Sequence, residues 1–106
     1  MYGNPQRRNV SDVQELRQAG GLWLKERREQ LGLSQRQLAK LVGADYYTFI
    51  SQLETGRGRI PPDRYGEWAC AFQMRKRDFV QRVLRYYDPV TYHILFSPDD
   101  DADGAV

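Results

Sequence analysis

The sequence predicts an all-α protein in which a domain of five helices carries a short additional element at each end. Apolar residues recur three and four positions apart along most of the chain, capping residues and glycines separate these runs, and no alternating run is long enough for a strand. The 106 residues, 41% of them hydrophobic, are enough for one modest core. We divide the chain into an N-terminal extension (1–21), a helical domain (22–87), a C-terminal segment (88–96) and a tail (97–106).

The first two elements are separated by a pair of glycines. Ser11 is the predicted N-cap of a helix in the extension, and Gly20 and Gly21 are expected to weaken or break that helix. A second helix is predicted from residue 22 to residue 31, where Gly32 ends it. The extension is therefore predicted to be separate from the first helix of the domain.

Two short helices follow and meet at a tight corner. Ser34 caps a helix over residues 35–42, and Gly43 ends it where the turn needs a positive φ. The predicted buried stripe of this helix is Leu38, Ala39, Leu41 and Val42. The next helix, 46–54, faces the core through Phe49, Ile50 and Leu53.

Three further segments complete the predicted fold. Pro61 and Pro62 begin a helix, because proline is tolerated in a first turn. Its core-facing residues follow helical spacing: Tyr65, Trp68, Ala69 and Phe72. A fifth helix of the domain covers residues 79–87, and Asp88 caps a short last helix that ends near Phe96. The tail has nothing to bury and is expected to be disordered.

Charge is unevenly distributed along the chain. Residues 1–87 hold all 16 Lys and Arg against 9 acidic residues, a net charge of +7. Residues 88–106 hold 5 Asp and no base, a net charge of −5. A basic folded body is typical of proteins with a polyanionic partner, although basic side chains also serve solubility.

Composition excludes several other classes of protein. No apolar run is long enough for a membrane span and the polar start is unlike a secretory signal, so we expect a cytoplasmic protein. Cys70, the only cysteine, is expected in the core, and His93 is the only histidine, so no metal site or catalytic pair can be assembled. The run 99–104 begins like a calcium loop but lacks the final glutamate. We expect neither an enzyme nor a cofactor.

The corner between residues 35–42 and 46–54 has the arrangement that presents one helix to the major groove of DNA. Opposite its buried face, the second helix carries uncharged side chains that can hydrogen-bond to base edges: Tyr46, Tyr47, Thr48, Ser51 and Gln52. Around them lie cations that suit phosphates: Arg36, Lys40, Arg57 and Arg59. Alternatively, the tyrosines pack on neighbouring helices and the cations form an ordinary charged surface.

Taken in order, these motifs resemble the lambda-repressor/Cro-like helix-turn-helix family, also called the XRE family, over roughly residues 22–80. The matching residues are Arg28, the run Gly32-Leu33-Ser34-Gln35, Leu38-Ala39, Gly43, and the run Ile50-Ser51-Gln52-Leu53-Glu54 followed by Gly56, Arg57 and Pro61. Two departures are visible. One residue is added near positions 43–45, and Arg27 stands where the family usually has an aliphatic residue.

The resemblance implies a role for individual residues. Aligned on Leu53 and Glu54, it implies base contacts by Tyr47, Thr48 and Gln52, beside which Ser51 also faces outward. It implies phosphate contacts by Gln35, Tyr46, Gly56 and Arg57, to which the charge pattern adds Arg36 and Arg59.

Arg28 and Glu54 are predicted to form a two-pronged ion pair. Arg28 lies four residues after Leu24 and three before Leu31, on the core-facing side of its helix, and Glu54 follows the buried Leu53. Partly desolvated charges need each other as partners. The family resemblance supports the pair, because its members commonly keep Arg and Glu at these positions.

We therefore predict a transcriptional regulator, expected to be a repressor, that binds double-stranded DNA sequence-specifically. A homodimer on an inverted repeat is expected, since two-fold symmetry places two recognition helices about 34 Å apart. The apolar cluster over residues 86–96 is the candidate dimer surface, and completion of the monomer core is the alternative. The competing hypothesis for the whole chain is a protein-interaction module of the antitoxin or adaptor kind.

Overall fold

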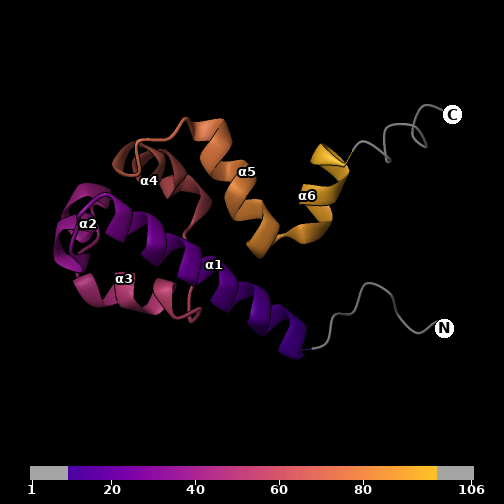
Figure 1. Ribbon diagram of the computed structural model, residues 1–106, viewed down its shortest axis with the longest axis horizontal. Coiled ribbons are helices and arrows are strands. Elements are labelled where there is room, and N and C mark those ends of the chain that lie inside the picture. The colour runs from indigo at the N-terminus through magenta and orange to yellow at the C-terminus, as the bar shows by residue number, and fades with distance from the viewer. Residues whose placement is uncertain (1–9, 98–106) are drawn as a thin grey trace, which may run out of the picture.

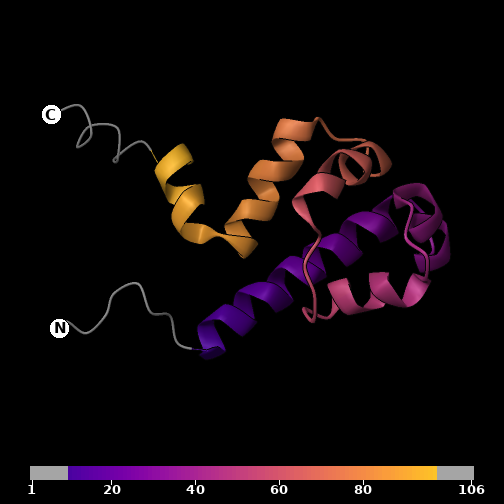
Figure 2. The ribbon, with the colours of Figure 1, turned by 180° about the vertical axis from the view of Figure 1, so that it is seen from behind.

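The computed structural model describes residues 10–97, and all regular structure in this range is helical, so the predicted all-α class is confirmed. The helices are α1 (Val10–Gln30), α2 (Gln35–Val42), α3 (Tyr47–Glu54), α4 (Tyr65–Ala71), α5 (Lys76–Tyr87) and α6 (Pro89–Phe96), with a 3-10 turn over Pro62–Arg64. The long α1 runs diagonally through the molecule, with α3 on one side and α4 and α5 on the other (Figure 1). Figure 2 shows the same arrangement from behind.

The predicted break at Gly20 and Gly21 is wrong, because α1 continues through both. Both glycines are buried against other helices. A Cβ atom on Gly21 would lie 2.5 Å from the carbonyl oxygen of Glu54, and one on Gly20 would lie 2.9 Å from Cβ of Tyr86. The glycines therefore allow α3 and α5 to approach α1, and this packing outweighs their low helix propensity.

Three predictions for single residues are also wrong. α1 begins at Val10, so Ser11 lies inside the helix and is not its N-cap. Leu41 is 54% exposed, and Cys70 is exposed as well. Successive residues of a helix turn by about 100°, so these two side chains project away from the core stripes of α2 and α4.

The core lies between α1 and two helix pairs, α2–α3 and α4–α5. Its fully buried large side chains are Trp68, Phe72, Phe79, Leu38, Ile50, Leu53 and Ile60. The rings of Trp68 and Phe72 meet edge to face with centroids 5.6 Å apart, and those of Phe72 and Phe79 at 5.9 Å. Such contacts add stabilisation beyond the burial of apolar area.

The ends of α2 agree with the prediction. The Ser34 hydroxyl accepts a hydrogen bond from the Gln37 backbone N–H, and the Gln37 side chain accepts one from the Ser34 N–H. Gly43 ends the helix with φ +73°, a left-handed conformation that glycine adopts without a steric penalty. These two ends determine where α2 stops and the corner begins.

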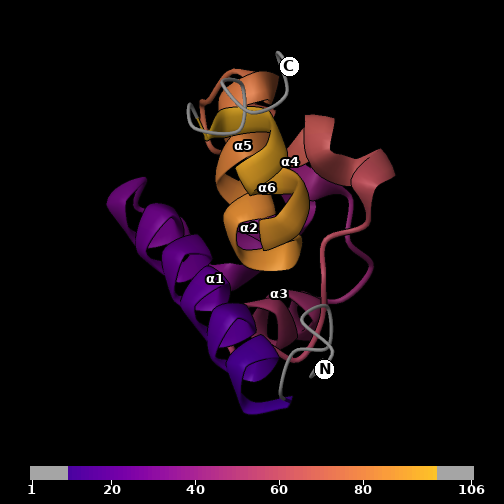
Figure 3. The ribbon, with the colours of Figure 1, turned by 90° about the vertical axis from the view of Figure 1, so that its right-hand side faces the viewer.

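α6 packs mainly against α5 (Figure 3). It begins at a side-chain cap. The Asp88 carboxylate accepts hydrogen bonds from the backbone N–H of Thr91 at 3.1 Å and from its hydroxyl at 2.6 Å. The 86–96 cluster is divided between core and surface, and its role as a dimer surface stays a prediction. Tyr87 packs against the core, whereas Val90, Ile94 and Leu95 are more than half exposed.

Candidate nucleic-acid interface

The two faces of α3 differ sharply in burial. Ile50 and Leu53 are almost completely buried, and they fix the inner face. Thr48 and Gln52 are exposed and Ser51 is half-buried on the outer face. Tyr46 is 74% and Tyr47 40% exposed. The structure thus leaves all five uncharged side chains of the sequence prediction partly or fully exposed, with the hydroxyl and amide groups that base edges require.

Tyr47 is in contact with Arg36 of α2. The Arg36 guanidinium carbon lies 4.4 Å from the centroid of the Tyr47 ring, a cation–π arrangement. Lys40 lines the same groove between α2 and the start of α3. A positive edge therefore borders the outer face of α3 on the α2 side.

The loop after α3 is held by a glycine-dependent turn. Gly56 has φ +83°, and the Arg57 N–H donates to the carbonyl of Gln52 at 2.9 Å, closing the end of the helix. A Cβ atom on Gly56 would lie 2.9 Å from the backbone nitrogen of Gln18 in α1. Glycine is therefore required both by φ and by space, and the exposed Arg57 lies directly at the end of α3.

Arg59 lies apart from the α3 face, over a ring of α5. Its guanidinium carbon is 5.0 Å from the Tyr87 ring centroid, and that of Arg17 in α1 is 5.6 Å from the same ring. The Tyr87 hydroxyl accepts a hydrogen bond from the Ile60 N–H, which ties the loop to α5. Burial, and then the charge of Arg59, lowers the pKa of Arg17. Two cations this close favour an anion beside them.

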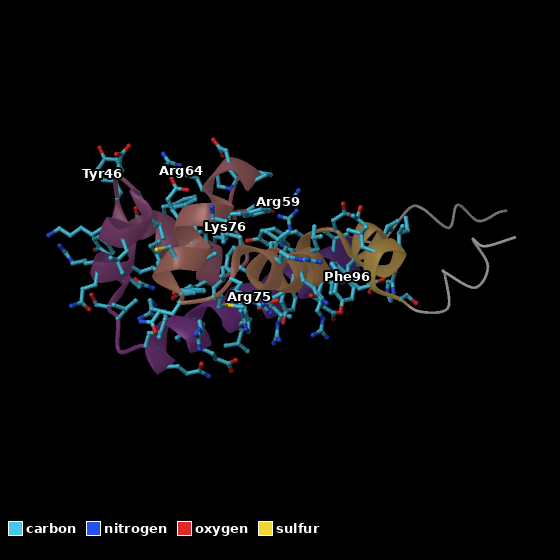
Figure 4. The ribbon with its side chains drawn as sticks, turned by 90° about the horizontal axis from the view of Figure 1, so that it is seen from above. Tyr46, Arg59, Arg64, Arg75, Lys76 and Phe96 are labelled. Atoms are coloured by element: carbon cyan, nitrogen blue, oxygen red, sulfur yellow. The ribbon has the colours of Figure 1, made fainter. Side chains whose placement is uncertain are left out.

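Arg64 is a further cation near the corner that the sequence interpretation missed. With Tyr46 it lines a groove that also includes Gly43 and Phe49. Figure 4 shows Tyr46 and Arg64 projecting at the same edge of the molecule. Arg64 also pairs with Glu67 at 3.3 Å, but both side chains are about half exposed. Its position depends on the packing of α4 beside α2, which no local motif indicates.

Arg28 and Glu54 form a two-pronged pair behind the α3 surface. Arg28 Nε donates to Glu54 Oε2 at 2.7 Å and Nη2 donates to Oε1 at 3.1 Å, with the side chains only 10% and 4% exposed. Arg28 Nη1 also donates to the Leu33 carbonyl at 2.8 Å. The hydrogen bond to Glu54 is the main reason that the pKa of Arg28 is raised. The pair joins α1 to the end of α3.

Gln35, expected at phosphate, lies against this same pair. Its Nε2 donates to Glu54 Oε1 at 3.0 Å, and the residue is half-buried at the start of α2. One of its amide hydrogens is therefore occupied within the protein. The Glu54 carboxylate connects the beginnings or ends of three helices: α1 through Arg28, α2 through Gln35, and α3 itself.

The departure from the family pattern at Arg27 has a structural explanation. Arg27 Nε and Nη2 donate to the Phe72 carbonyl at 3.1 and 2.7 Å. That carbonyl lies at the end of α4, where backbone acceptors lack helical partners and the helix dipole favours a positive charge. The guanidinium thus caps α4 at a position where an aliphatic residue would only fill space.

Within residues 10–97, no group of His, Cys, Asp and Glu side chains is arranged to hold a metal ion. No helix in the same range is long and apolar enough to cross a membrane. The calcium-like run at 99–104 lies outside the described residues.

Comparisons with known proteins agree with this geometry. Residues 24–79 match the family described as Helix-turn-helix. The crystal structure of the restriction-modification controller protein C.AhdI from Aeromonas hydrophila is similar, with 28% sequence identity and a TM-score of 0.52. That match covers 65% of this chain and 97% of the controller protein. No curated protein matches the chain.

Proposed function

Because the chain belongs to the lambda-repressor-like helix-turn-helix family of DNA-binding transcription regulators, we propose that it is a repressor that binds an inverted-repeat operator sequence-specifically as a homodimer. The observation that carries the proposal is the outer face of α3. It offers exposed, uncharged hydrogen-bonding side chains and is bordered by cations at both ends. The similarity to a restriction-modification controller protein supports a regulatory role.

In this proposal, base reading and backbone anchoring are assigned to different residues. The base-reading side chains are Tyr47, Thr48, Ser51 and Gln52. Phosphates are contacted by Gln35, Arg36, Tyr46, Gly56, Arg57 and Arg59. We add Arg17, because its guanidinium shares the Tyr87 ring with Arg59, and Arg64, because it borders Tyr46.

The proposed dimer uses α6. Val90, Ile94 and Leu95 are 57%, 61% and 60% exposed, so an apolar surface on this helix has no partner within residues 10–97. α6 lies at the other end of the molecule from α2, so a partner there leaves the α3 face open (Figure 1). Sedimentation of Ile94→Asp tests this: we expect a monomer, and an unchanged dimer would place the interface elsewhere. A wild-type monomer would instead favour the adaptor hypothesis.

Selection of bound genomic fragments, followed by titration of variants, tests DNA reading. Gln52→Ala should cost about 1–3 kcal/mol at the selected site and relax preference at one base pair. Arg57→Ala should weaken selected and random duplexes alike and reduce the salt slope by about 1. Lys25→Ala, on the exposed side of α1, is the matched control. If Gln52→Ala and Arg57→Ala both lost the same affinity on selected and on random DNA, the assigned register would be wrong. An affinity that does not change with salt concentration would exclude phosphate-dominated binding.

A further inference from the structure

A groove of about 440 Å³ lies between α1, α5 and α6, apart from the α3 face. Its aromatic walls are Trp23 of α1 and Tyr92 of α6, and its cations are Arg27, Arg82 and Arg85. In Figure 1, α1 runs between α3 and the pair α5–α6, so this groove does not belong to the proposed base-reading surface.

The groove has an excess of positive charge. Its one carboxylate, Asp78, is paired with Arg75 at 3.0 Å. Within residues 10–97, none of the three lining arginines forms a salt bridge. The site is therefore suited to an anion with several carboxylates or phosphates.

Aromatic rings hold two of these arginines in place. The Arg82 guanidinium carbon lies 5.2 Å from the Trp23 ring centroid, and that of Arg85 lies 5.9 Å from the Tyr92 centroid. Stacking fixes a guanidinium while its N–H edges remain able to donate to carboxylates. The groove thus presents oriented donors.

We infer that this groove binds the aspartate-rich segment of the same chain, residues 99–103. The segment 98–106 holds four aspartates and no base, and it follows Ser97 at the end of α6. Tyr92, in the groove wall, precedes Ser97 by about 8 Å at the helical rise of about 1.5 Å per residue. Extended chain covers about 3.3 Å per residue, so Asp101 reaches about 13 Å back from Ser97. Tethering also gives the segment a high effective concentration.

Occupation of the groove by this segment has a consequence for DNA binding. An uncovered arginine groove away from α3 attracts the DNA backbone without reading sequence. A bound acidic segment neutralises it and leaves the α3 face as the main basic surface. The inferred role is therefore to suppress non-specific binding.

The location of the segment can be measured without DNA. A nitroxide is attached to Ala102→Cys in a Cys70→Ser background, and NMR line broadening is recorded over the full chain. We expect loss of the Trp23 indole signal and no effect on the Thr48 amide. The Trp23 indole signal should return in the double variant Arg82→Gln/Arg85→Gln. It should also return in the variant in which four aspartates are changed to Asn, namely Asp99, Asp100, Asp101 and Asp103. It should stay broadened in the control Lys25→Gln. Broadening of the Thr48 amide signal would overturn the inference. So would broadening of the Trp23 signal that is unchanged in Arg82→Gln/Arg85→Gln.

A second measurement addresses the consequence. In the Asn variant of the segment, affinity for a random duplex should rise several-fold at low salt, and adding Arg82→Gln/Arg85→Gln should cancel the rise. A rise that persists without the two arginines would mean that the segment acts only through its general charge, and would refute the inferred role. The NMR result does not depend on the proposed operator binding, so the two can fail separately.

Discussion

Loss of either partner of the Arg28–Glu54 pair should destabilise the fold more than any surface ion pair of the molecule. Arg28→Met leaves the Glu54 carboxylate, 4% exposed, with only the Gln35 amide as a hydrogen-bond partner. Glu54→Leu leaves the Arg28 guanidinium, 10% exposed, with only the Leu33 carbonyl near it and the exposed Glu29 at 4.0 Å. A stranded buried charge costs about 3–5 kcal/mol, so we expect that loss in the free energy of unfolding for each variant.

The double variant separates pairing from simple loss of packing. Replacing both charges by apolar side chains removes the stranded partner, so the double variant should be more stable than the sum of the single losses predicts, by at least about 2 kcal/mol. The measurement is urea unfolding followed by tryptophan fluorescence. Glu54→Gln, which keeps hydrogen bonding, covers the case in which Glu54→Leu does not fold.

A surface pair of the same chain provides the matched control. Arg75 and Asp78 are 3.0 Å apart, but their side chains are 86% and 46% exposed. Their coupling energy should be at most about 1 kcal/mol, because solvent screens exposed charges. If the Arg28–Glu54 cycle gave a coupling as small as this control, the pair would contribute nothing specific to the position of α3, and our reasoning would be refuted.

Three further predictions follow from single contacts. Gly21→Ala should destabilise the fold by about 1–3 kcal/mol, because the added Cβ would lie 2.5 Å from the Glu54 backbone oxygen. Gly66→Ala is the control and should not destabilise, because its Cβ would have its nearest neighbour at 3.5 Å. Equal melting temperatures of the two variants would contradict this prediction. Arg27→Met should cost about 1.5–3 kcal/mol in urea unfolding, because the Phe72 carbonyl loses both donors; an unchanged midpoint would show that solvent replaces them. The hydroxyl and then the backbone N–H of Thr91 lower the pKa of Asp88 from its ordinary 3.8. Because the folded-state pKa is lowered, the cap stabilises α6 above pH 3.8, and this stabilisation is lost as the pH falls through the folded-state pKa. Protection of the α6 amides from hydrogen exchange should therefore decline in that pH range. Protection that does not change with pH would refute the role of the cap.

Local rules predicted much of this fold, because the relevant signals are themselves local. Ser34 and Gly43 determine the ends of α2 through hydrogen bonds and backbone angles that involve only neighbouring residues. The inner face of α3 follows from helical spacing alone, with Ile50 and Leu53 on the core side.

Two features that the sequence left wrong or unexplained, the glycine pair and Arg27, depend on contacts between distant segments. Gly20 and Gly21 look like helix breakers in sequence, and only the approach of α3 and α5 gives them a reason to stay helical. Arg27 has no role in its own helix, since its partner is a carbonyl 45 residues away. Leu41 shows the opposite case, in which an apolar residue was assigned to the core although its direction on the short α2 leaves it exposed.

α1 helps to set the position of α3 at three points. At Gly21, the absence of a side chain lets the backbone carbonyls at the end of α3 lie against the middle of α1. Seven residues further along α1, Arg28 pairs with Glu54. Before Gly21, the turn at Gly56 packs on the backbone of Gln18. Because these contacts reach from Gln18 to Arg28, about 15 Å along α1 at a rise of about 1.5 Å per residue, they restrain α3 in tilt as well as in position. The same α1 carries Trp23 and Arg27 on the side of the arginine groove. α1 therefore contributes both to the position of α3 and to one wall of the arginine groove.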